Sequence, residues 1–504
     1  MRRLSALLVC TLLSAAPAPA REVMVGASEL RPAGPLGFLV PRLDPPPIDP
    51  LQAEIDPAAA DPAAGLLRRS LAQGLAAGFD GLLYDNRDRG HSALPAGLFP
   101  RLARIRYAPE LRAEGLDYGL GGAILWPWPT LGNSSTALTG GPAPRSLPRA
   151  AMTFPGGGPA RAFRGYAANM LYVYPEHRDH DAVDLFPAAW PYMVISQGSS
   201  GSDQPFLRAL AMTMAAFRPD TRARLVTAGL MAPTLQMLLR RAQAGAAGPA
   251  DYLSPAAHPA VFDAARLVPE RMVAAAAALA PEEIPPMVRL TVEAEDFAPA
   301  AGLAGRMERL YSTPSALARV WRGPAGRREI TLSAGETRDP NGRALRFHWV
   351  LLSGDPEKVR IAPEGPAGAR AGITIDWHDA VTLPGGRPGS RVDIAAIAWN
   401  GAQFSAPALV SVSFPDHQLR RYETGPDGAP RLAEIDYRAQ GRDYDPVLHW
   451  SADWRDVMIY DASGRLAAIE RHQGDSVTRI DPARPPAYRV TGPERRPRLV
   501  ADAP

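Results

Sequence analysis

Gly81-Leu-Leu-Tyr84 runs directly into Asp85-Asn-Arg-Asp-Arg-Gly-His-Ser92, and this change from an apolar to a polar run decides the fold class. A short apolar run that ends in a polar loop is typical of a buried strand in an α/β sheet. Three other apolar runs end in the same way, at residues 122–126 before 132–136, at 170–174 before 176–181, and at 192–195 before 196–203. Ligands of open α/β sheets bind outside the carboxyl ends of the strands, so we expect these four polar loops to meet at one edge.

The polar runs stand out because the rest of the chain is strongly biased in composition. Of 504 residues, 54 are proline and 45 are glycine, Lys358 is the only lysine, and asparagine occurs only at positions 86, 133, 169, 341 and 400. Three of these asparagines lie between Tyr84 and Asp203, in the segment that also holds a fifth polar run, Arg145-Ser-Leu-Pro-Arg149. A segment that departs from such a bias indicates a physical requirement on its side chains.

The N-terminus has the pattern of a secretory signal peptide, which we expect to span residues 1–20. Arg2 and Arg3 precede an apolar run at residues 4–15, and Ala18-Pro-Ala20 is a typical cleavage site. Cleavage would remove Cys10, the only cysteine, and would exclude disulfides and cysteine-based chemistry. We therefore expect a secreted or periplasmic protein.

The charge balance excludes an electrostatic binder of nucleic acid. The chain has 55 basic and 52 acidic residues, and without Arg2 and Arg3 the numbers are 53 and 52. There is no basic stripe with interleaved aromatic residues, so we expect no nucleic-acid partner. No apolar run after the signal is long enough to cross a bilayer, so we also expect no membrane span.

The chain is long enough for several domains, and its patterns predict a multidomain fold. An N-terminal α/β domain, with mixed strands followed by helices, precedes an immunoglobulin-like β-sandwich and a small C-terminal β unit. The expected parts are a Pro/Ala-rich arm at 21–65, the α/β domain at 66–300, a linker at 301–327, the sandwich at 328–415, the β unit at 416–490 and a mobile tail at 491–504. Within the α/β domain, helices are predicted at 204–217, with Ser202 as the N-cap, at 221–228, and from Pro233, Pro255 and Pro269 onward.

A family resemblance covers about 90 residues of the later region. Ser333-Ala-Gly-Glu-Thr-Arg-Asp-Pro-Asn-Gly-Arg-Ala-Leu-Arg-Phe-His-Trp349 resembles the first strands of PKD-type and related immunoglobulin-like domains. Val392-Asp-Ile-Ala-Ala-Ile-Ala-Trp-Asn-Gly401 and Ser405-Ala-Pro407 are similar to the closing strands of that family. The chain departs from the family at Gly354-Asp-Pro, where Gly-Asp-Gly is usual. The resemblance implies a β-sandwich that serves as a spacer or binding module, without catalysis.

The loop at residues 85–92 carries the residues of an acid–base pair and of an anion site. Asp88 is placed to orient His91, which leaves the other imidazole nitrogen as a general base or acid. Arg87 and Arg89 could hold a carboxylate or phosphate. The alternative is an Arg–Asp network that only fastens the loop.

The loop at residues 176–181 has the composition of a metal site. His177, Asp179, His180 and Asp181 offer nitrogen and oxygen ligands for zinc, manganese or iron. The run resembles the His-x-His-x-Asp-His motif of metallo-β-lactamase-fold hydrolases, but Pro175 stands where the first histidine belongs. A divalent metal therefore remains one alternative, and a solvated charged loop is the other.

The remaining polar runs predict donors for a substrate. Ser196-Gln-Gly-Ser-Ser-Gly-Ser-Asp203 lies between a strand and a helix, where backbone N–H groups favour an anion. Ser199 is a candidate nucleophile, and the other candidate substrate-binding residues of these runs are Asn133, Ser134, Arg145, Gln197, Ser200 and Ser202. A capped turn or salt-bridged loop is the alternative for each run.

These patterns lead to two functional hypotheses. The first is a secreted hydrolase that acts on an anionic or polyhydroxylated small molecule or glycan, with Asp88, His91, His180 and Ser199 as catalytic residues. The second is a non-catalytic protein that binds the cell envelope or carbohydrate and uses its β domains as spacers. The sequence does not decide the reaction, the metal or the oligomeric state.

Overall fold

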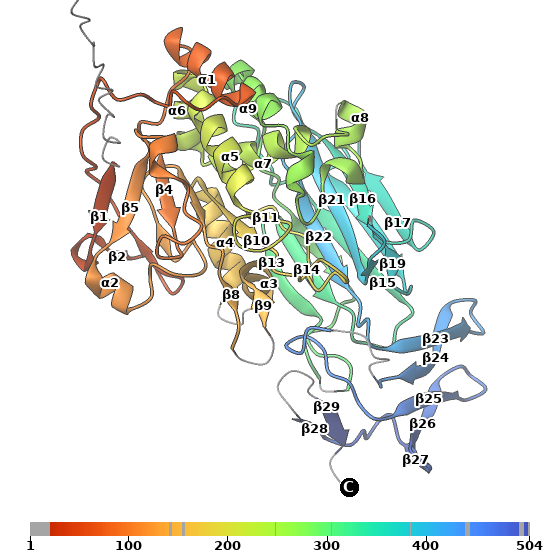
Figure 1. The fold of residues 1–504 in the computed structure, drawn as a ribbon. Helices are drawn as coiled ribbons and strands as arrows, with labels where there is room; N and C mark the ends of the chain where they lie inside the picture. The colour runs from red at the N-terminus through yellow and green to blue at the C-terminus, as the bar shows by residue number, and fades with distance from the viewer. Residues whose placement is uncertain are drawn as a thin grey trace, which may run out of the picture.

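The computed structural model describes residues 21–140, 144–153, 157–246, 248–303, 305–383, 385–438, 444–492 and 498–501. The expected signal segment 1–20, with Cys10, lies outside the described residues. The N-terminal part is an α/β unit, and several β-sheets follow it along the chain (Figure 1). This arrangement confirms the coarse expectation of a multidomain α/β and β protein.

A six-stranded parallel sheet forms the centre of the α/β unit. Its order across the sheet is β1 (Glu22–Val25), β5 (Ala103–Tyr107), β4 (Leu83–Asn86), β7 (Thr130–Asn133), β10 (Met170–Pro175) and β11 (Met193–Ser196). The chain passes from β4 to β5 on one side and then to β7 on the other side of β4, so the winding reverses at β4. Such a reversal opens a crevice at the carboxyl ends of the strands, where ligands bind.

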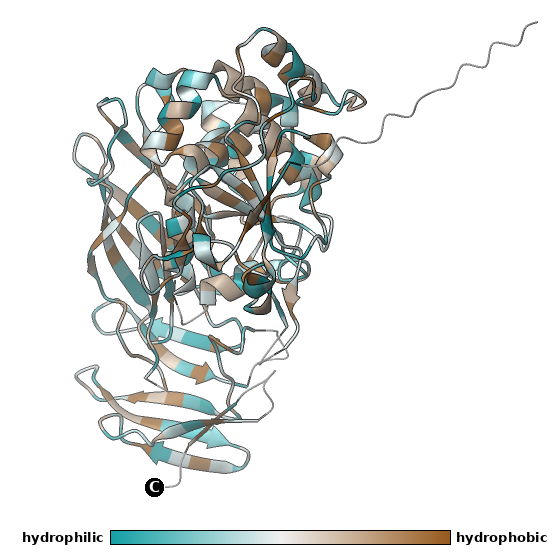
Figure 2. Cartoon of the chain, turned by 90° about the vertical axis from the view of Figure 1, so that its left-hand side faces the viewer, coloured by the Kyte–Doolittle hydropathy of each residue, from teal (hydrophilic) through white to brown (hydrophobic). Residues whose placement is uncertain are grey.

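Two groups of helices cover the two faces of this sheet. Neighbouring residues of a strand face opposite sides, so Tyr172 and Tyr174 of β10 share one face and Asn133 of β7 lies on the other. The helices α3 (Leu147–Thr153) and α4 (Gly158–Ala167) lie on the tyrosine face. The helices on the Asn133 face pack on one another, namely α1 (Pro62–Ala72), α5 (Gln204–Ala216) and α9 (Pro269–Ala278). The hydrophobic residues of this unit concentrate in its interior strands and helices (Figure 2).

Most of the predicted helices are present. The segment predicted at 204–217 forms α5, and those predicted from 221 and 233 form α6 (Pro219–Ala228) and α7 (Met231–Arg241). The helix predicted at Pro255 is only the 3-10 turn η3 (Pro255–Ala257). The predicted N-cap is wrong, because Asp203 occupies that position and the hydroxyl of Ser202 bonds to Ser196 at 2.9 Å. The other helices of the unit are short, α2 (Pro109–Ala113) and α8 (Pro249–Tyr252).

The structure differs from one strand prediction and from the expected arm in this unit. The apolar run at 122–126 gives only β6 (Ile124–Leu125), which pairs with β3 (Phe38–Leu39) in a separate small sheet, β2-β3-β6, with β2 at Arg31–Pro32. The strand that leads into the polar loop is instead β7, which starts after the alternating prolines 127 and 129 because these cannot donate to a ladder. The arm expected at 21–65 contains the strand β1 and the start of α1, so it is not simply an extended arm.

Two antiparallel-rich sheets follow the α/β unit and share one hydrophobic cluster. The first has the order β12 (Thr291–Glu295), β15 (Arg327–Ser333), β18 (Arg370–Asp376) and β17 (Val359–Glu364). The second has the order β13 (Arg309–Thr313), β14 (Ala316–Val320), β22 (Ala408–Ser413), β21 (Arg391–Trp399) and β16 (Arg346–Ser353). The predicted alternation of Ile330 and Leu332 is confirmed, since both side chains are buried in the shared cluster. The immunoglobulin-like assignment stays a prediction.

The segment expected to be a linker, residues 301–327, contains two strands. Residues 309–320 form β13 and β14, and β12 already pairs with β15, so the β region extends to both sides of that segment. The sequence did not indicate these strands, because their apolar runs are short and are interrupted by arginines. A minor ribbon, β19 (Val381–Thr382) with β20 (Pro388–Gly389), completes this region.

The C-terminal unit is an antiparallel meander with a small hairpin beside it. The meander runs through β23 (Leu419–Thr424), β24 (Pro430–Asp436), β25 (Arg455–Tyr460), β26 (Leu466–Gln473) and β27 (Ser476–Ile480). The hairpin predicted around residues 461–464 is confirmed, because β25 pairs with β26 across that turn. The tail expected to be mobile from 491 contains β29 (Arg498–Ala501), which pairs with β28 (Tyr488–Thr491).

The β region packs directly against the α/β unit. Strand β21 is buried on both faces, since Ile394 belongs to the cluster between the two sheets and Ile397 to the core of the α/β unit. At this contact, the guanidinium of Arg391 lies 2.8 Å from Asp184 and 2.8 Å from Asp393. All three side chains are at most 5% exposed. The contact makes the β region part of the support of the α/β unit and not a detached spacer.

Among the described helices, none combines the length and the hydrophobicity that a transmembrane segment requires.

Replacing the buried cation at this contact should strongly destabilise the protein. In Arg391→Met, two buried carboxylates lose their counter-charge, and the expected loss in free energy of unfolding is about 3–5 kcal/mol. Urea unfolding followed by tryptophan fluorescence measures it. The matched control is Arg370→Met, which removes an exposed pairing with Glu293 and Glu364 and should cost less than about 1 kcal/mol. Equal losses in the two variants would contradict the assigned role of Arg391.

Candidate functional site

The loops after β4 and β7 join in a compact group of Asp88, His91 and Ser135. Asp88 Oδ2 lies 3.1 Å from His91 Nδ1, and Ser135 Oγ lies 2.7 Å from each of these two atoms. The carboxylate and the hydroxyl are buried, whereas 62% of the His91 side chain is exposed. The predicted orientation of His91 by Asp88 is therefore present in the structure.

The hydrogen bonds of this group assign the tautomer of His91. An ionised carboxylate only accepts, so the hydroxyl of Ser135 donates its single proton to Asp88. The oxygen of Ser135 can then only accept from His91 Nδ1, which must carry the proton. His91 Nε2 is left with its lone pair on the exposed side of the ring. A neutral imidazole held in this way has the form of a general base.

Ser135 also connects this group to the loop after β10. Its carbonyl oxygen lies 2.7 Å from His177 Nε2, and a carbonyl can only accept, so His177 Nε2 donates. Its backbone N–H donates to Asp88 Oδ2 at 3.1 Å. A single residue thus fixes the positions of Asp88, His91 and His177.

Glu176 connects the loop after β10 to the loop after β11. Its carboxylate accepts from the backbone N–H of His180 at 3.0 Å and of Gly198 at 3.1 Å. The N–H of His177 in turn donates to the carbonyl of Gly198 at 3.0 Å. Burial, opposed by these two hydrogen bonds and reinforced by Asp181, raises the pKa of Glu176 to about 7.

Asp203, at the start of α5, connects the loop after β11 to the loops after β4 and β7. Its carboxylate accepts from Ser92 Oγ at 2.7 Å and from Asn133 Nδ2 at 2.5 Å. Burial raises the pKa of Asp203, and these two hydrogen bonds oppose the rise. All four loops are consequently joined by hydrogen bonds at the carboxyl edge of the sheet, which confirms the predicted convergence.

Backbone strain is concentrated in two of these loops. Among the described residues, five that are not glycine have positive φ, and four of them are Arg89, Ser92, His177 and Arg178, with φ between 46° and 71°. Such conformations are disfavoured for residues with a Cβ and persist only where the surroundings hold them. The contacts of Asp88, Ser135 and Glu176 supply that support.

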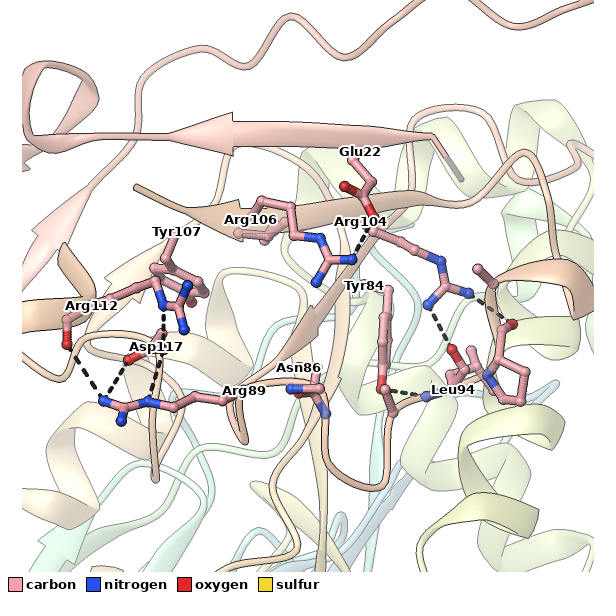
Figure 3. Close-up of a pocket in the computed structure, with 15 residues that line it drawn as sticks. Glu22, Tyr84, Asn86, Arg89, Leu94, Arg104, Arg106, Tyr107, Arg112 and Asp117 are labelled. Atoms are coloured by element: carbon pink, nitrogen blue, oxygen red, sulfur yellow. Dashed lines mark hydrogen bonds and ion pairs between the residues drawn. The ribbon is translucent and has the colours of Figure 1, made fainter. Parts of the chain in front are cut away.

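A polar cavity of about 390 Å³ lies beside the loop at residues 85–92 (Figure 3). Its charged lining consists of the guanidinium groups of Arg89, Arg104, Arg106 and Arg112 and the carboxylates of Glu22 and Asp117. The carboxylates pair with Arg106 at 2.5 Å and with Arg89 at 3.1 Å. Among the described residues, Arg104 donates to two backbone carbonyls, at 2.6 and 2.9 Å, and its guanidinium lies over the ring of Tyr84, while burial lowers its pKa to about 10. With four cations against two anions, the cavity favours an anionic group.

The proposed metal set does not form. Asp179 accepts from the backbone N–H of Ser146 at 2.8 Å and from Arg149 at 3.1 Å, His180 lies beside Phe186, and His177 bonds to Ser135. Within the described ranges, no three His, Cys, Asp or Glu side chains are grouped so that they could hold a metal ion. Adjacent residues of this irregular loop point to different neighbours, so the spacing of His177, Asp179, His180 and Asp181 does not bring their side chains together.

His180 and Ser199 do not join the group around His91. His180 is buried, lies 3.8 Å from Asp184, and its pKa is lowered to about 4, mainly by burial, so it stays neutral. In the part of the chain that the structure describes, no histidine bonds to the hydroxyl of Ser199 or Ser200. Among the described residues, neither serine therefore has the base that a nucleophile needs, and the geometry lends no support to the catalytic roles predicted for His180 and Ser199.

The predicted substrate-binding residues are only partly accessible. Asn133 is fully buried, and its amide oxygen and nitrogen both bond within the protein, while Ser134 is buried beneath the same loop. The other predicted residues show no hydrogen bond to Asp88, His91 or Ser135 among the described residues. Arg145 lies on β9 (Arg145–Ser146), which pairs with β8 (Ala137–Leu138). Gln197 and Ser200 are exposed, and Ser202 bonds to Ser196. Arg89 lines the polar cavity, but Arg87 is buried on the opposite face of the sheet, against Tyr107.

The residues that hold the site together were missed, although they lie in the polar runs. Hydrogen bonds between loops that are distant in sequence are formed by Ser135, Glu176 and Asp203. Their positions directly after β7, after β10 and before α5 are the only sequence signal for them. Which of several adjacent polar residues points inward depends on backbone geometry that periodicity does not reveal.

Comparisons with known proteins do not identify this chain. No family model matches, and no curated protein matches. A solved nucleoside hydrolase-related hypothetical protein from Saccharophagus degradans, associated with carbohydrate metabolism, shares 10% identity and a TM-score of 0.20 over 57% of this chain and 71% of its own. The tandem Ig repeats of Dlar share 8% identity and a TM-score of 0.13 over 39% of this chain and 95% of their own. The N-terminal Ig1-2 module of the Drosophila receptor DLAR shares 9% identity and a TM-score of 0.13 over 38% and 95%. Similarity at these scores supports no assignment.

Removing the carboxylate of Glu176 should increase the stability of the protein, relative to wild type, as the pH rises from 4.5 to 8. The pKa of this group rises from its ordinary 4.5 to about 7 on folding, so the folded state binds more protons and the contribution of Glu176 to stability falls as pH rises through that range. Relative to wild type, Glu176→Gln should gain up to about 3 kcal/mol in free energy of unfolding between pH 4.5 and 8.

Unfolding midpoints measured at several pH values test this expectation. Glu114→Gln is the control, because it removes an exposed carboxylate at the end of α2 and makes the same change in charge. The same pH trend in both variants would show that the effect comes from net charge and not from the burial of Glu176.

Proposed function

We propose that this protein is an exported hydrolase in which His91 is the general base. The observation that carries the proposal is the hydrogen-bonded group of Asp88, His91 and Ser135 at the point where the winding of the sheet reverses. Asp88 and Ser135 hold the Nδ1–H tautomer, and Nε2 faces outward. Export rests on the signal-like pattern at residues 1–20.

In the proposed reaction, His91 Nε2 takes a proton from a water molecule. The water oxygen forms a bond to the electrophilic atom of the substrate, and the bond to the leaving group breaks. The imidazolium, stabilised by Asp88, then returns the proton to the leaving group. Asp88 stays ionised throughout, so its role is to orient and stabilise the ring.

We propose an anionic, polyhydroxylated substrate. The cavity beside the loop has four guanidinium groups against two carboxylates, and within the described part of the chain Arg104 forms no ion pair with a carboxylate. A carboxylate or phosphate of the substrate would provide the missing counter-charge. Arg89, on the same loop as His91, would connect the anion site to the reacting group.

Substitution of His91 tests the proposal. On a panel of anionic esters, phosphate esters and glycosides, His91→Ala should lower kcat/KM by about 10²–10⁴-fold, which is the usual contribution of a positioned acid–base group. Asp88→Asn should cause a loss of similar size, because the amide no longer selects the Nδ1–H tautomer. His472→Ala, at a partly exposed histidine of β26, is the control and should keep the wild-type rate.

The outcome separates the two functional hypotheses. Full activity of folded His91→Ala would contradict the assigned base. A wild-type protein that binds the anionic ligands, turns over none of them and loses binding in Arg104→Met would instead be a recognition protein.

A further inference from the structure

A second cavity of about 390 Å³ lies on the opposite face of the sheet from the arginine-rich one. Its walls come from α3 and α4 on one side and from the tyrosine face of β10 on the other. The loop at residues 85–92 separates the two cavities, since Arg89 lines the first and Arg87 lines the second. A volume of this size accommodates a small organic ligand.

The walls of this cavity are largely aromatic and aliphatic. Tyr172 and Tyr174 lie with ring centroids 6.1 Å apart and planes within 10° of each other, and Tyr166 lies 5.3 Å from Tyr192. A Cβ at Gly119 would meet no atom within 4 Å, so the backbone there borders open space. An aromatic ring would find partners at favourable distances on these walls.

The charged side chains that line this cavity are both cations. They are Arg87 and Arg161, and none of the described lining residues is Asp or Glu. Arg87 is only 3% exposed, and its buried Nε has no hydrogen-bond partner among the described residues. Arg161 donates from Nε to the carbonyl of Leu36 at 3.2 Å, and its pKa is lowered by burial first and then by the nearby charge of Arg87.

Among the described residues, a single carboxylate lies close to these cations, and it can balance only one of them. Asp85 Oδ2 lies 3.9 Å from Arg87, and the Asp85 carboxylate also accepts from Tyr107 at 2.8 Å and from Tyr172 at 2.6 Å. Two guanidinium groups against one carboxylate leave one excess positive charge next to an apolar wall. Uncompensated buried charge is costly, and an anion in the cavity would relieve that cost.

We propose that this cavity binds a small aromatic carboxylate. Its ring lies against the tyrosines of β10, and its carboxylate pairs with Arg87 and Arg161. The ligand needs both a ring and a carboxylate. An apolar ligand would leave the cations without a counter-charge, and an inorganic anion would leave the apolar walls without a contact. The site is separate from the proposed hydrolytic site and does not depend on it.

Calorimetric titration with 4-phenylbutyrate and with its neutral amide tests the proposal on the wild-type protein. The carboxylate should bind at least about 10-fold more tightly than the amide, as expected for a charge-assisted hydrogen bond worth about 1.4 kcal/mol or more. Arg161→Met should remove this preference, and Arg161→Lys should keep part of it. Ala162→Phe, on the wall formed by α4, should fill the cavity and abolish binding of both ligands.

Matched variants make the result specific to this cavity. Arg112→Met removes a cation from the other cavity and should leave both titrations unchanged. Absence of 4-phenylbutyrate binding, equal binding of the acid and the amide, or loss of binding in Arg112→Met but not in Ala162→Phe would each overturn the proposal.

Discussion

The geometry of the proposed site depends on the carboxylate of Asp88. This group accepts from the backbone and hydroxyl of Ser135, from His91 and, at 3.3 Å, from Thr136. It joins the loop after β4 to the loop after β7 and selects the tautomer of the exposed imidazole. A buried carboxylate with several donors also supports the positive φ of Arg89, which would not persist in an unsupported loop.

The rest of the molecule holds this edge of the sheet in place from two sides. Asp203 and Glu176 fasten the loop after β11 from within the α/β unit. From outside, Arg391 of the β region pairs with Asp184, which lies in the segment between β10 and β11. In the same segment, Asp179 pairs with Arg149 at 3.1 Å, and Arg149 also lies 3.5 Å from Asp445. Later parts of the chain therefore help to position the loop that contains His177.

The sequence predicted the convergence of the polar loops better than the contacts within them. Apolar runs followed by polar loops correctly indicated β4, β10 and β11, because strand length and buried side chains leave a direct pattern. The prediction from the run at 122–126 was wrong, because Ile124 and Leu125 pair with β3 in a small separate sheet and not with the main sheet. The predicted metal set did not form, because the spacing of residues along a loop does not determine the direction of their side chains. The contact between Asp88 and His91 was predicted correctly because a separation of three residues lets the two side chains meet within one turn.

The protonation state of His91 is the most direct test of the account. A long-range ¹H–¹⁵N spectrum of histidine-labelled protein, recorded at a pH above the range in which histidine side chains ordinarily titrate, reports which ring nitrogen carries the proton. The spectrum of His91→Gln identifies the signal of His91. The account predicts a neutral His91 protonated at Nδ1, with Nε2 unprotonated, and loss of this preference in Asp88→Asn. A His91 protonated at Nε2, as in most free imidazole side chains in water, would contradict it.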